Sequence, residues 1–497
     1  MSCRFRSTVL LALGLLIVAS YPALGKELED REWIEVQTPN FRIRSALSEM
    51  DSIELARRLE MFRLSVSVVT NISRIDSPIP TEIYAVRGRS DLESLGISAD
   101  LGGIFRSGLR NNLIVIRDVR GMEEASIIMH EYVHFLVRNH GSLLYPKWYS
   151  EGFADYLSAG QSQSGKYVIG GVHKVRSKRL SRSRWIPLRM ILSPEDYGGW
   201  SKERRSMFYA EAWALVHYLQ HRPERDTLSQ DMTRYVELVE SGKGDVEAFE
   251  EAFVITAKDL DKQVKRHLVG PKIHSIYLSI DELLPDLEPD VIALSQEQIA
   301  LSLGQIALRL KELDSAKHWF TIAATDEISR PRAEAGLGEV LRFSGDFEAA
   351  RPHFELAVAL APSDPYCQLD IANYWYHRAR RSKDKENRAT YLARAREHYV
   401  NAWKLDDSMP ETYARYGDTF VTEGRRYDYA IELLEQAERI LPSNITVRMF
   451  LARAYLKADR KEDAVAAARS ILVWSHDESK AAKLARKILA KPASGTE

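Results

Sequence analysis

Cysteine is almost absent from this sequence, which has only Cys3 and Cys367 among 497 residues. Two such distant cysteines, the first inside a predicted export signal, do not make a disulfide framework. The fold must therefore be stabilised by packed hydrophobic cores, which a chain of this length can build. Two or three domains are expected.

An excess of charge of either sign is also lacking, because 69 Lys and Arg residues balance 70 Asp and Glu residues. The sequence therefore gives no electrostatic reason to expect nucleic acid or an anionic membrane as the main partner. We predict no nucleic-acid partner.

Only one long apolar run is present, at residues 9–19, and it is shorter than the roughly 20 residues that span a bilayer. Two arginines precede this run and small residues follow it, as in a secretory signal cut before Lys26. An uncleaved membrane anchor is the alternative. We predict a signal peptide at 1–25 and a periplasmic or extracellular mature protein with no integral membrane segment.

The region after the signal mixes strand and helix patterns. Residues 49–69 have apolar residues at helical spacing, and from Met122 onward the helical period dominates. The strand-like segments are a hairpin at 33–45 and single strands at 81–86 and 112–117. We predict an α+β domain, with a small mixed sheet plus helices, over residues 26–270.

The last 200 residues repeat a pattern at a spacing near 34 residues. Small residues at fixed positions let paired helices approach, and large residues fill the grooves between pairs. The first copy contains Leu303, Gly304, Ala307, Ala316, Phe320 and Ala323, and the second contains Leu337, Gly338, Leu341, Ala350, Phe354 and Ala357. A third copy fits if the charged stretch 381–388 is an insertion between its helices.

This pattern resembles tetratricopeptide repeat proteins. The resemblance implies an all-α tetratricopeptide solenoid, which we place at 296–490 after a linker at 271–295. A solenoid of this kind provides a surface for a protein partner and does not itself imply a reaction.

Chemistry is concentrated in His130-Glu131-Tyr132-Val133-His134, within a predicted helix at 123–139. Residues four apart lie on one helix face, so both imidazoles can point to the same ion. Glu131 can then reach a water bound to that ion and act as a base. A catalytic zinc site normally has three protein ligands and an open position, so a third ligand is needed.

Residues 148–156 read Trp-Tyr-Ser-Glu-Gly-Phe-Ala-Asp-Tyr. Together with the His-Glu-Tyr-Val-His motif, this segment resembles the gluzincin metallopeptidases, including the aminopeptidase-N and thermolysin groups. The resemblance implies a zincin-like catalytic fold and a Zn²⁺ ion bound by His130, His134 and Glu151. Glu151 follows His134 by 17 positions, slightly fewer than in the aminopeptidases.

Asp155 lies one helical turn after Glu151 and is predicted to hydrogen-bond the outer nitrogen of a ligand histidine. A surface acid is the alternative. Residues 209–219 resemble the helix that carries the catalytic tyrosine in aminopeptidase-like gluzincins, and most closely the peptidase-MA-like domains. That likeness implies that Tyr209 donates a hydrogen bond to the oxyanion. The alternative is that Tyr209 packs in a helical core.

Four other histidines, His140, His173, His217 and His221, are predicted to be ordinary residues, because they have no acidic neighbour in the pattern.

The resemblance also makes predictions about the substrate. In zincins an edge strand beside the metal pairs with the extended substrate, and 112–117 is the candidate here, with the loop 102–108 bordering the cleft. The sequence has no counterpart of the Gly-Ala-Met-Glu-Asn segment that anchors a free substrate amine, which favours an endopeptidase acting on peptides or proteins. Two alternatives stay open: an exported repeat scaffold with a catalytically silent peptidase-like domain, and a hydrolase of non-peptide amides.

Overall fold

The computed structural model describes residues 28–72, 75–117, 122–140, 145–194, 197–269, 274–284, 287–474 and 479–490. The predicted signal peptide at 1–25 lies outside these residues. Among the helices described, none combines the length and the hydropathy that crossing a bilayer requires.

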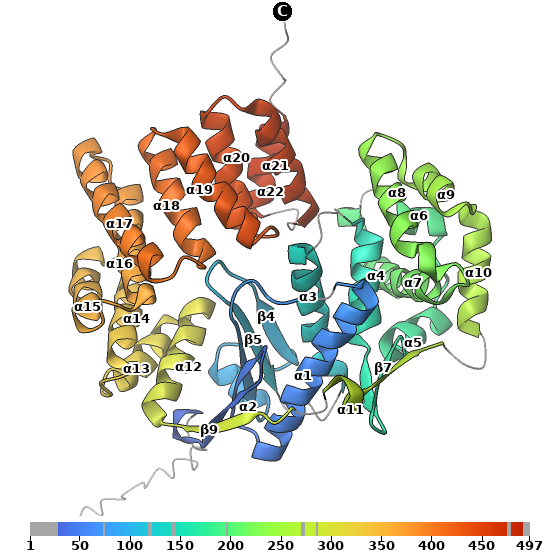
Figure 1. Cartoon of the computed structure of the whole chain (residues 1–497), viewed down its shortest axis with the longest axis horizontal. Coiled ribbons are helices and arrows are strands. Elements are labelled where there is room, and N and C mark those ends of the chain that lie inside the picture. The colour runs from blue at the N-terminus through green and yellow to red at the C-terminus, as the bar shows by residue number, and fades with distance from the viewer. Residues whose placement is uncertain are drawn as a thin grey trace, which may run out of the picture.

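The N-terminal region contains a six-stranded mixed sheet in the order β4-β5-β3-β2-β1-β9 (Figure 1). The predicted hairpin is confirmed, because β1 and β2 pair antiparallel, while β2, β3 and β5 run parallel. The strands are β1 (Trp33–Gln37), β2 (Arg42–Ser45), β3 (Thr81–Val86), β4 (Gly103–Arg106), β5 (Asn112–Arg117) and β9 (Asp290–Leu294).

Two predictions about the sheet edge were wrong. The segment 102–108, expected as a loop, contains β4, which pairs antiparallel with β5 and forms the edge of the sheet. Residues 112–117 are therefore an internal strand. Strand β5 is internal because its four consecutive apolar residues, 113–116, are all buried. An unbroken apolar run of this kind is typical of a strand covered on both faces.

Both faces of the sheet are buried, and they face different parts of the chain. Ile114 and Ile116 of β5 share a core with α1 and α3, whereas Leu113 and Val115 share a second core with helices α12 and α13 of the repeat region. Because side chains alternate along a strand, this division follows the pleat of β5. The repeat region thus covers the second face of the sheet.

Helices surround the sheet and form a separate lobe beside it. Ser48 begins α1, since its side chain accepts a hydrogen bond from the backbone N–H of Asp51. The helices are α1 (Glu49–Thr70), α2 (Arg89–Ser94), α3 (Met122–His140), α4 (Lys147–Ser158), α5 (Lys174–Arg182), α6 (Leu188–Leu192), α7 (Lys202–His221), α8 (Leu228–Glu240), α9 (Asp245–Phe253) and α10 (Ala257–Val269). Short 3₁₀ turns occur at η1 (Leu28–Asp30), η2 (Tyr197–Gly199) and η3 (Arg225–Thr227).

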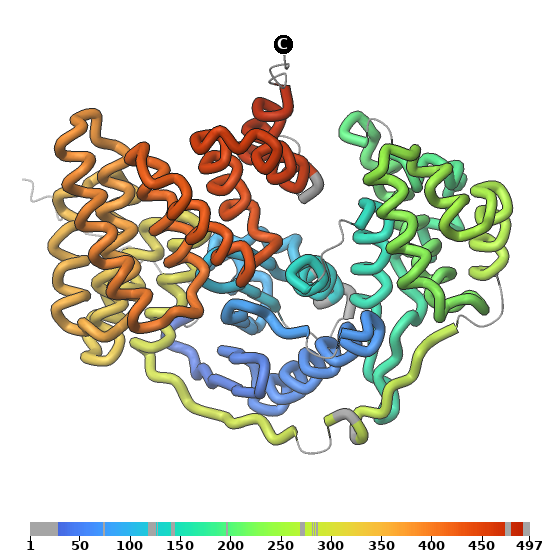
Figure 2. Tube along the Cα trace, turned by 45° about the horizontal axis from the view of Figure 1, so that its top comes forward, coloured from blue at the N-terminus to red at the C-terminus, as the bar shows by residue number. Residues whose placement is uncertain are grey.

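The predicted linker at 271–295 contributes strands as well as a connection (Figure 2). It contains β8 (Ile276–Ser279), which joins β6 (Gln161–Gln163) and β7 (Lys166–Ile169) in a three-stranded sheet, and the short helix α11 (Ile280–Leu283). It ends in β9, which pairs with β1 and leads directly into the repeats.

Five helix pairs and a final helix form the C-terminal region, as the 34-residue period predicts. The predicted role of the small residues is confirmed, because Gly304 lies against the ring of Phe320 and Gly338 lies against the ring of Phe354. The pairs are α12 (Gln296–Leu310) with α13 (Leu313–Ala323), α14 (Arg330–Phe343) with α15 (Phe347–Leu360), α16 (Pro365–Arg381) with α17 (Lys385–Leu405), α18 (Pro410–Glu423) with α19 (Tyr427–Ile440), and α20 (Ile445–Lys457) with α21 (Lys461–Trp474), followed by α22 (Lys480–Leu489).

The insertion predicted in the third repeat does not form a separate loop. Helix α16 continues to Arg381 and α17 begins at Lys385, so the charged residues lengthen both helices. Lys, Arg and Glu are good helix formers, and Asp384 caps α17 by accepting from the backbone N–H of Asn387.

The repeats also bind the turn between β4 and β5. The guanidinium of Arg110 donates through Nη2 to Asp370 Oδ1 at 2.7 Å and through Nε to Glu411 Oε2 at 3.0 Å. Arg309 of α12 donates to the backbone oxygen of Arg106 at 2.8 Å. Burial lowers the pKa of Arg110, but the two carboxylates outweigh it and hold that pKa well above its usual range. The β4–β5 turn is thereby fixed to the repeats by charged hydrogen bonds.

Replacing Arg110 by leucine should lower the free energy of unfolding by about 2–3 kcal/mol, because Asp370 loses its cation and Glu411 loses one hydrogen bond. Urea denaturation followed by tryptophan fluorescence measures this loss. Arg351→Leu is the control, since Arg351 and Glu355 form an exposed pair at 3.8 Å and should contribute less than about 1 kcal/mol. Equal effects of both variants would contradict a stabilising role of the Arg110 contact.

Candidate metal centre

Two helices present the candidate ligands from opposite sides. His130 and His134 lie one turn apart on α3, and Glu151 lies near the start of α4. Helix α4 packs closely on α7 at Gly152, where a Cβ atom would lie 2.3 Å from the backbone oxygen of Ala212. Any larger residue would displace α4, so Gly152 sets the position of Glu151.

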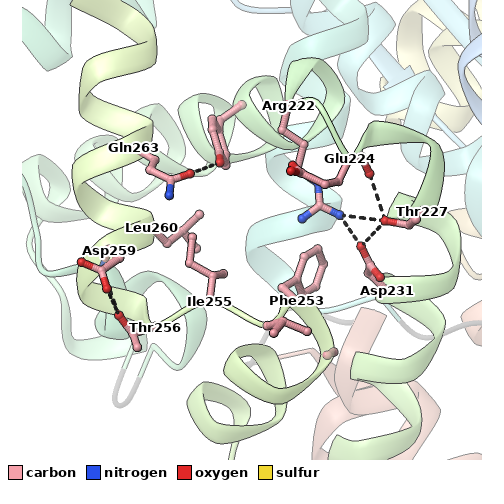
Figure 3. Close-up of a pocket in the computed structure, with 13 residues that line it drawn as sticks. Arg222, Glu224, Thr227, Asp231, Phe253, Ile255, Thr256, Asp259, Leu260 and Gln263 are labelled. Atoms are coloured by element: carbon pink, nitrogen blue, oxygen red, sulfur yellow. Dashed lines mark hydrogen bonds and ion pairs between the residues drawn. The ribbon is translucent and has the colours of Figure 1, made fainter.

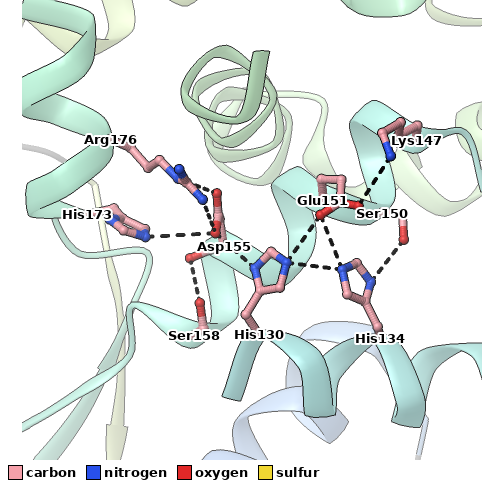
Figure 4. Close-up of polar contacts among 9 residues, drawn as sticks. All are labelled: His130, His134, Lys147, Ser150, Glu151, Asp155, Ser158, His173 and Arg176. Atoms are coloured by element: carbon pink, nitrogen blue, oxygen red, sulfur yellow. Dashed lines mark hydrogen bonds and ion pairs between the residues drawn. The ribbon is translucent and has the colours of Figure 1, made fainter. Parts of the chain in front are cut away.

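The three side chains converge on one point (Figure 4). The two imidazole Nε2 atoms are 3.1 Å apart, and Glu151 Oε2 lies 3.2 Å from His130 Nε2 and 3.4 Å from His134 Nε2. Atoms that bind one ion tetrahedrally at 2.0–2.1 Å are about 3.3 Å apart, so the donor set fits a divalent metal ion.

Outer partners fix the orientation of both rings. His130 Nδ1 donates to Asp155 Oδ1 at 2.9 Å, as predicted for Asp155, and His134 Nδ1 donates to Ser150 Oγ at 3.1 Å. When a metal ion displaces the Nε2 protons, each ring presents the lone pair of Nε2 to that ion. Three acceptors that face one another are stabilised by a cation between them, which is the arrangement that metal-binding histidines use.

The titration of these groups follows from their contacts. Burial lowers the pKa of His130, but hydrogen bonds with Asp155 and Glu151 outweigh it and raise the value to about 10. Burial lowers the pKa of His134. Burial alone would raise the pKa of Glu151, yet its hydrogen bonds to the two histidines keep it well below its usual range. Glu151 is therefore an anion, as a metal ligand must be.

The group lies in a cleft of about 1400 Å³ that Glu131 and Tyr209 also line. Within the described ranges no hydrogen bond or ion pair engages the exposed carboxylate of Glu131. Tyr197 lies beside Tyr209 in the lining. Burial and the charge of Glu151 raise the pKa of Tyr209, so its hydroxyl keeps a proton to donate.

Several residues of the site carried no recognisable signal in the sequence. Arg176 holds Asp155 through hydrogen bonds of 2.6 and 3.1 Å and places its guanidinium 5.2 Å from the centre of the Tyr209 ring. His173 Nε2 lies 3.9 Å from Asp155 Oδ1, although this histidine was predicted to be ordinary. These residues lie on or beside α5, outside the motifs at 130–134 and 148–156. They are close to the metal group only because of the way the chain folds.

The walls of the cleft come from distant parts of the chain. Helix α8 contributes Tyr235, Val236 and Val239, and Leu472 of α21 adds a residue from the last repeat. The lining therefore includes both the N-terminal region and the repeats.

A second pocket, of about 690 Å³, lies between the end of α7 and helices α8, α9 and α10 (Figure 3). Its polar side chains bond mainly to one another, as in the ion pair between Arg222 and Asp231 and the hydrogen bond of Asp259 with Thr256. It contains no histidine. Unlike the first cleft, it presents no group of converging metal ligands.

His217 and His221, predicted to be ordinary helix residues, lie outside the lining of the first cleft. They join His267 and His274 in a cluster, in which His217 and His267 have ring centres 5.0 Å apart. The Nε2 of His217 donates to the backbone oxygen of Gly170 at 2.7 Å, so its Nδ1 accepts from His267 Nε2 at 2.8 Å. Burial lowers the pKa of His217 to about 4.

Metal content tests the three-ligand group. The purified protein should carry about one divalent metal ion per chain, and His134→Ala should lose it, because two donors bind an ion much more weakly than three. Mass spectrometry of the metals in dialysed protein measures this. His140→Ala is the matched control on the same helix, since the one partner of His140 among the described residues is the backbone oxygen of Leu136, and this variant should keep the metal. Stoichiometric metal in His134→Ala would refute the site.

Because of the histidine cluster, we expect the folded protein to lose stability in mild acid. The unfolded chain protonates His217 below a pKa of about 6.5, whereas the folded protein resists protonation down to about 4. The contribution of His217 is thus fully present above pH 6.5 and falls by about 3 kcal/mol as the pH drops toward 4. His217→Gln should flatten the pH dependence of unfolding measured in urea, and His140→Gln should not. Parallel curves for the wild type and His217→Gln would contradict this.

Three solved structures are similar to parts of this chain. A thermophilic tetratricopeptide protein of Thermus thermophilus, TTC0263, is 22% identical, with 39% of this chain and 98% of that chain covered and a TM-score of 0.35. Cut9–Hcn1 of the APC/C is 15% identical (74% and 67% covered, TM-score 0.33), and yeast Tom70 is 14% identical (74% and 72% covered, TM-score 0.32). A search of curated proteins found no match.

Family comparisons agree with the division of the chain. Residues 124–236, which contain the whole metal group, match a family described as a protein of unknown function (DUF1570). Tetratricopeptide repeat families match residues 335–364 and 421–488. None of these descriptions names a peptidase. The chain thus combines a mixed α/β region that contains a domain of unknown function with C-terminal tetratricopeptide repeats.

Proposed function

We propose that this protein is a zinc-dependent endopeptidase of the gluzincin type, exported to the periplasm or the cell exterior, whose repeats bind a protein partner. The observation that carries the proposal is the convergence of His130, His134 and Glu151 within 3.4 Å of one another, in a cleft that also exposes Glu131. A metal site with only a structural role would need no base beside it.

Different residues of the chain have different roles in the proposed hydrolysis. A zinc ion at this site would supply a polarised water with a pKa near 7 and a positive charge for the substrate carbonyl. Glu131, free of other partners in the described part of the chain, would act as the base for the attacking water and then as the acid for the leaving nitrogen. Glu131 lies three residues before His134 on α3, at a spacing that makes neighbours on a helix surface, and it lines the same cleft as the metal group.

Tyr209 stabilises the negative charge that develops on the carbonyl oxygen. Its protonated hydroxyl is a hydrogen-bond donor, and Arg176 lies 5.2 Å from its ring. Asp155, which Arg176 holds in place, keeps His130 in the tautomer that leaves Nε2 free. Arg176 therefore contacts both Asp155 and Tyr209.

The size of the cleft favours a polypeptide over a small amide. Its volume of about 1400 Å³ exceeds the roughly 300–1000 Å³ that small-molecule sites occupy. The edge strand β4 packs against α3, and its outer edge carries no further strand in the described part of the chain. We assign to β4 the role of pairing with the extended substrate that the sequence had suggested for 112–117.

Peptide hydrolysis by Glu131→Gln tests the proposal. Because the amide cannot take a proton from water, the rate should fall by about 10²-fold to 10⁴-fold while the metal stays bound. Cleavage of a peptide library and of denatured proteins, followed by mass spectrometry, measures this. Glu240→Gln, which changes another acid in the lining of the cleft, on α8, is the matched control and should keep activity.

The alternative is an exported tetratricopeptide scaffold with a catalytically silent domain. It predicts that the metal-loaded wild type cleaves nothing in the library, like Glu131→Gln. That outcome would overturn the enzyme proposal and leave the repeats as the functional part.

A further inference from the structure

Arg138 is a charged residue of the cleft that the proposed chemistry does not use. It lies on α3 one turn after His134, so His130, His134 and Arg138 follow one another along the same helix face. Its side chain is partly buried and lines the cleft. The negative charges of Glu151 and Glu131 act on its guanidinium, which places it near the metal group.

This guanidinium has no hydrogen bond, ion pair or aromatic ring as a partner among the residues that the structure describes. Two neighbouring cations, in contrast, have partners. Arg176 is bound to Asp155, and Lys147 lies 3.9 Å from Glu151 and 4.6 Å from the centre of the Tyr197 ring. A cation partly removed from water is costly unless something pairs with it. The missing partner of Arg138 is therefore expected to come from a ligand.

The rim of the cleft adds further unpaired positive charge. Lys202 and Arg205, both exposed on the first turn of α7, line the same cleft, and no described side chain forms an ion pair with either. Among the acids of the lining, Glu151, Asp155 and Asp245 have partners, so that Glu240 is the one free carboxylate besides Glu131 among the described residues of the lining. Beyond the catalytic base, the free charge that faces a substrate is thus mostly positive.

We propose that Arg138 binds a carboxylate of the substrate, so that the enzyme selects polypeptides with an acidic side chain close to the cleaved bond or, acting as a carboxypeptidase instead of an endopeptidase, those with a free C-terminus there. A guanidinium forms two parallel hydrogen bonds with a carboxylate, which a neutral amide cannot match. One helical turn is about 5.4 Å and an extended residue about 3.3 Å, so this carboxylate lies within one or two residues of the bond over the metal.

The inference refines the proposed peptidase function, and a binding experiment tests it separately from catalysis. The probes are fluorescent ten-residue peptides that contain either Asp and Glu or Asn and Gln, each made with a free and an amidated C-terminus. Fluorescence anisotropy with metal-loaded Glu131→Gln protein gives the dissociation constants without cleavage. The acidic side chains, the free C-terminus or both should bind about tenfold to a hundredfold more tightly than the neutral amide.

Adding Arg138→Gln to this protein should abolish that preference. Arg351→Gln, which removes the same charge from the exposed face of α15, should leave it unchanged. Lys202→Gln with Arg205→Gln should weaken binding mainly at low salt, because exposed charges are screened. Arg138→Lys keeps the charge without the paired donors and should retain part of the preference. This variant is the control for a folding defect in Arg138→Gln.

The outcomes separate the two proposals. Selective binding of carboxylates through Arg138 with no cleavage by the wild type would overturn the peptidase function and support this inference. Cleavage without preference, or a preference that survives Arg138→Gln, would overturn the inference and leave the peptidase intact. The inference would also be overturned if heparin, a polyanion with sulfates, bound as tightly as the acidic peptides and Arg138→Gln changed neither affinity.

Discussion

The structure depends on one constraint: the six-stranded sheet has two apolar faces, and each must be covered. Helices α1 and α3 cover one face, and the first helix pair of the repeats covers the other. Strand β9 joins the sheet and continues directly into α12, so the repeat region is fixed at its starting point. The two regions share a hydrophobic core, although their sequence patterns suggest separate domains.

The position of the metal group follows from this arrangement. Helix α3 is held by its apolar face against the sheet, which directs its two histidines to the opposite side. Helix α4 can approach them because Gly152 allows close packing on α7. Charged hydrogen bonds then complete the orientation, from Arg176 through Asp155 to His130. Rigid packing thus fixes the positions of the helices, and the polar network fixes the orientations of the imidazole rings.

Much of this could be predicted from local sequence. The hairpin, helix α1, the strands β3 and β5, and the repeat helices each follow a clear periodicity, and the HExxH spacing placed His130 and His134 on one face. Glu151 and Asp155 were found through a motif of nine residues. What could not be predicted depends on contacts between distant segments. β4 begins at the second glycine of a Gly-Gly pair that indicates a turn, and only its pairing with β5 makes it a strand. Arg176, His173 and Arg138 have no pattern of their own, because their role depends on where α5 and α3 lie relative to α4.

The contact between Arg110 and the inner helices of the repeats has a consequence for how binding partners are sought. A fragment containing the repeats alone would expose the apolar surface of α12 and the carboxylates of Asp370 and Glu411, which the full chain covers. Such a fragment, used as bait, would attract basic and hydrophobic proteins that never meet those surfaces in the intact molecule. A genuine partner binds the faces that stay exposed when the whole chain is folded.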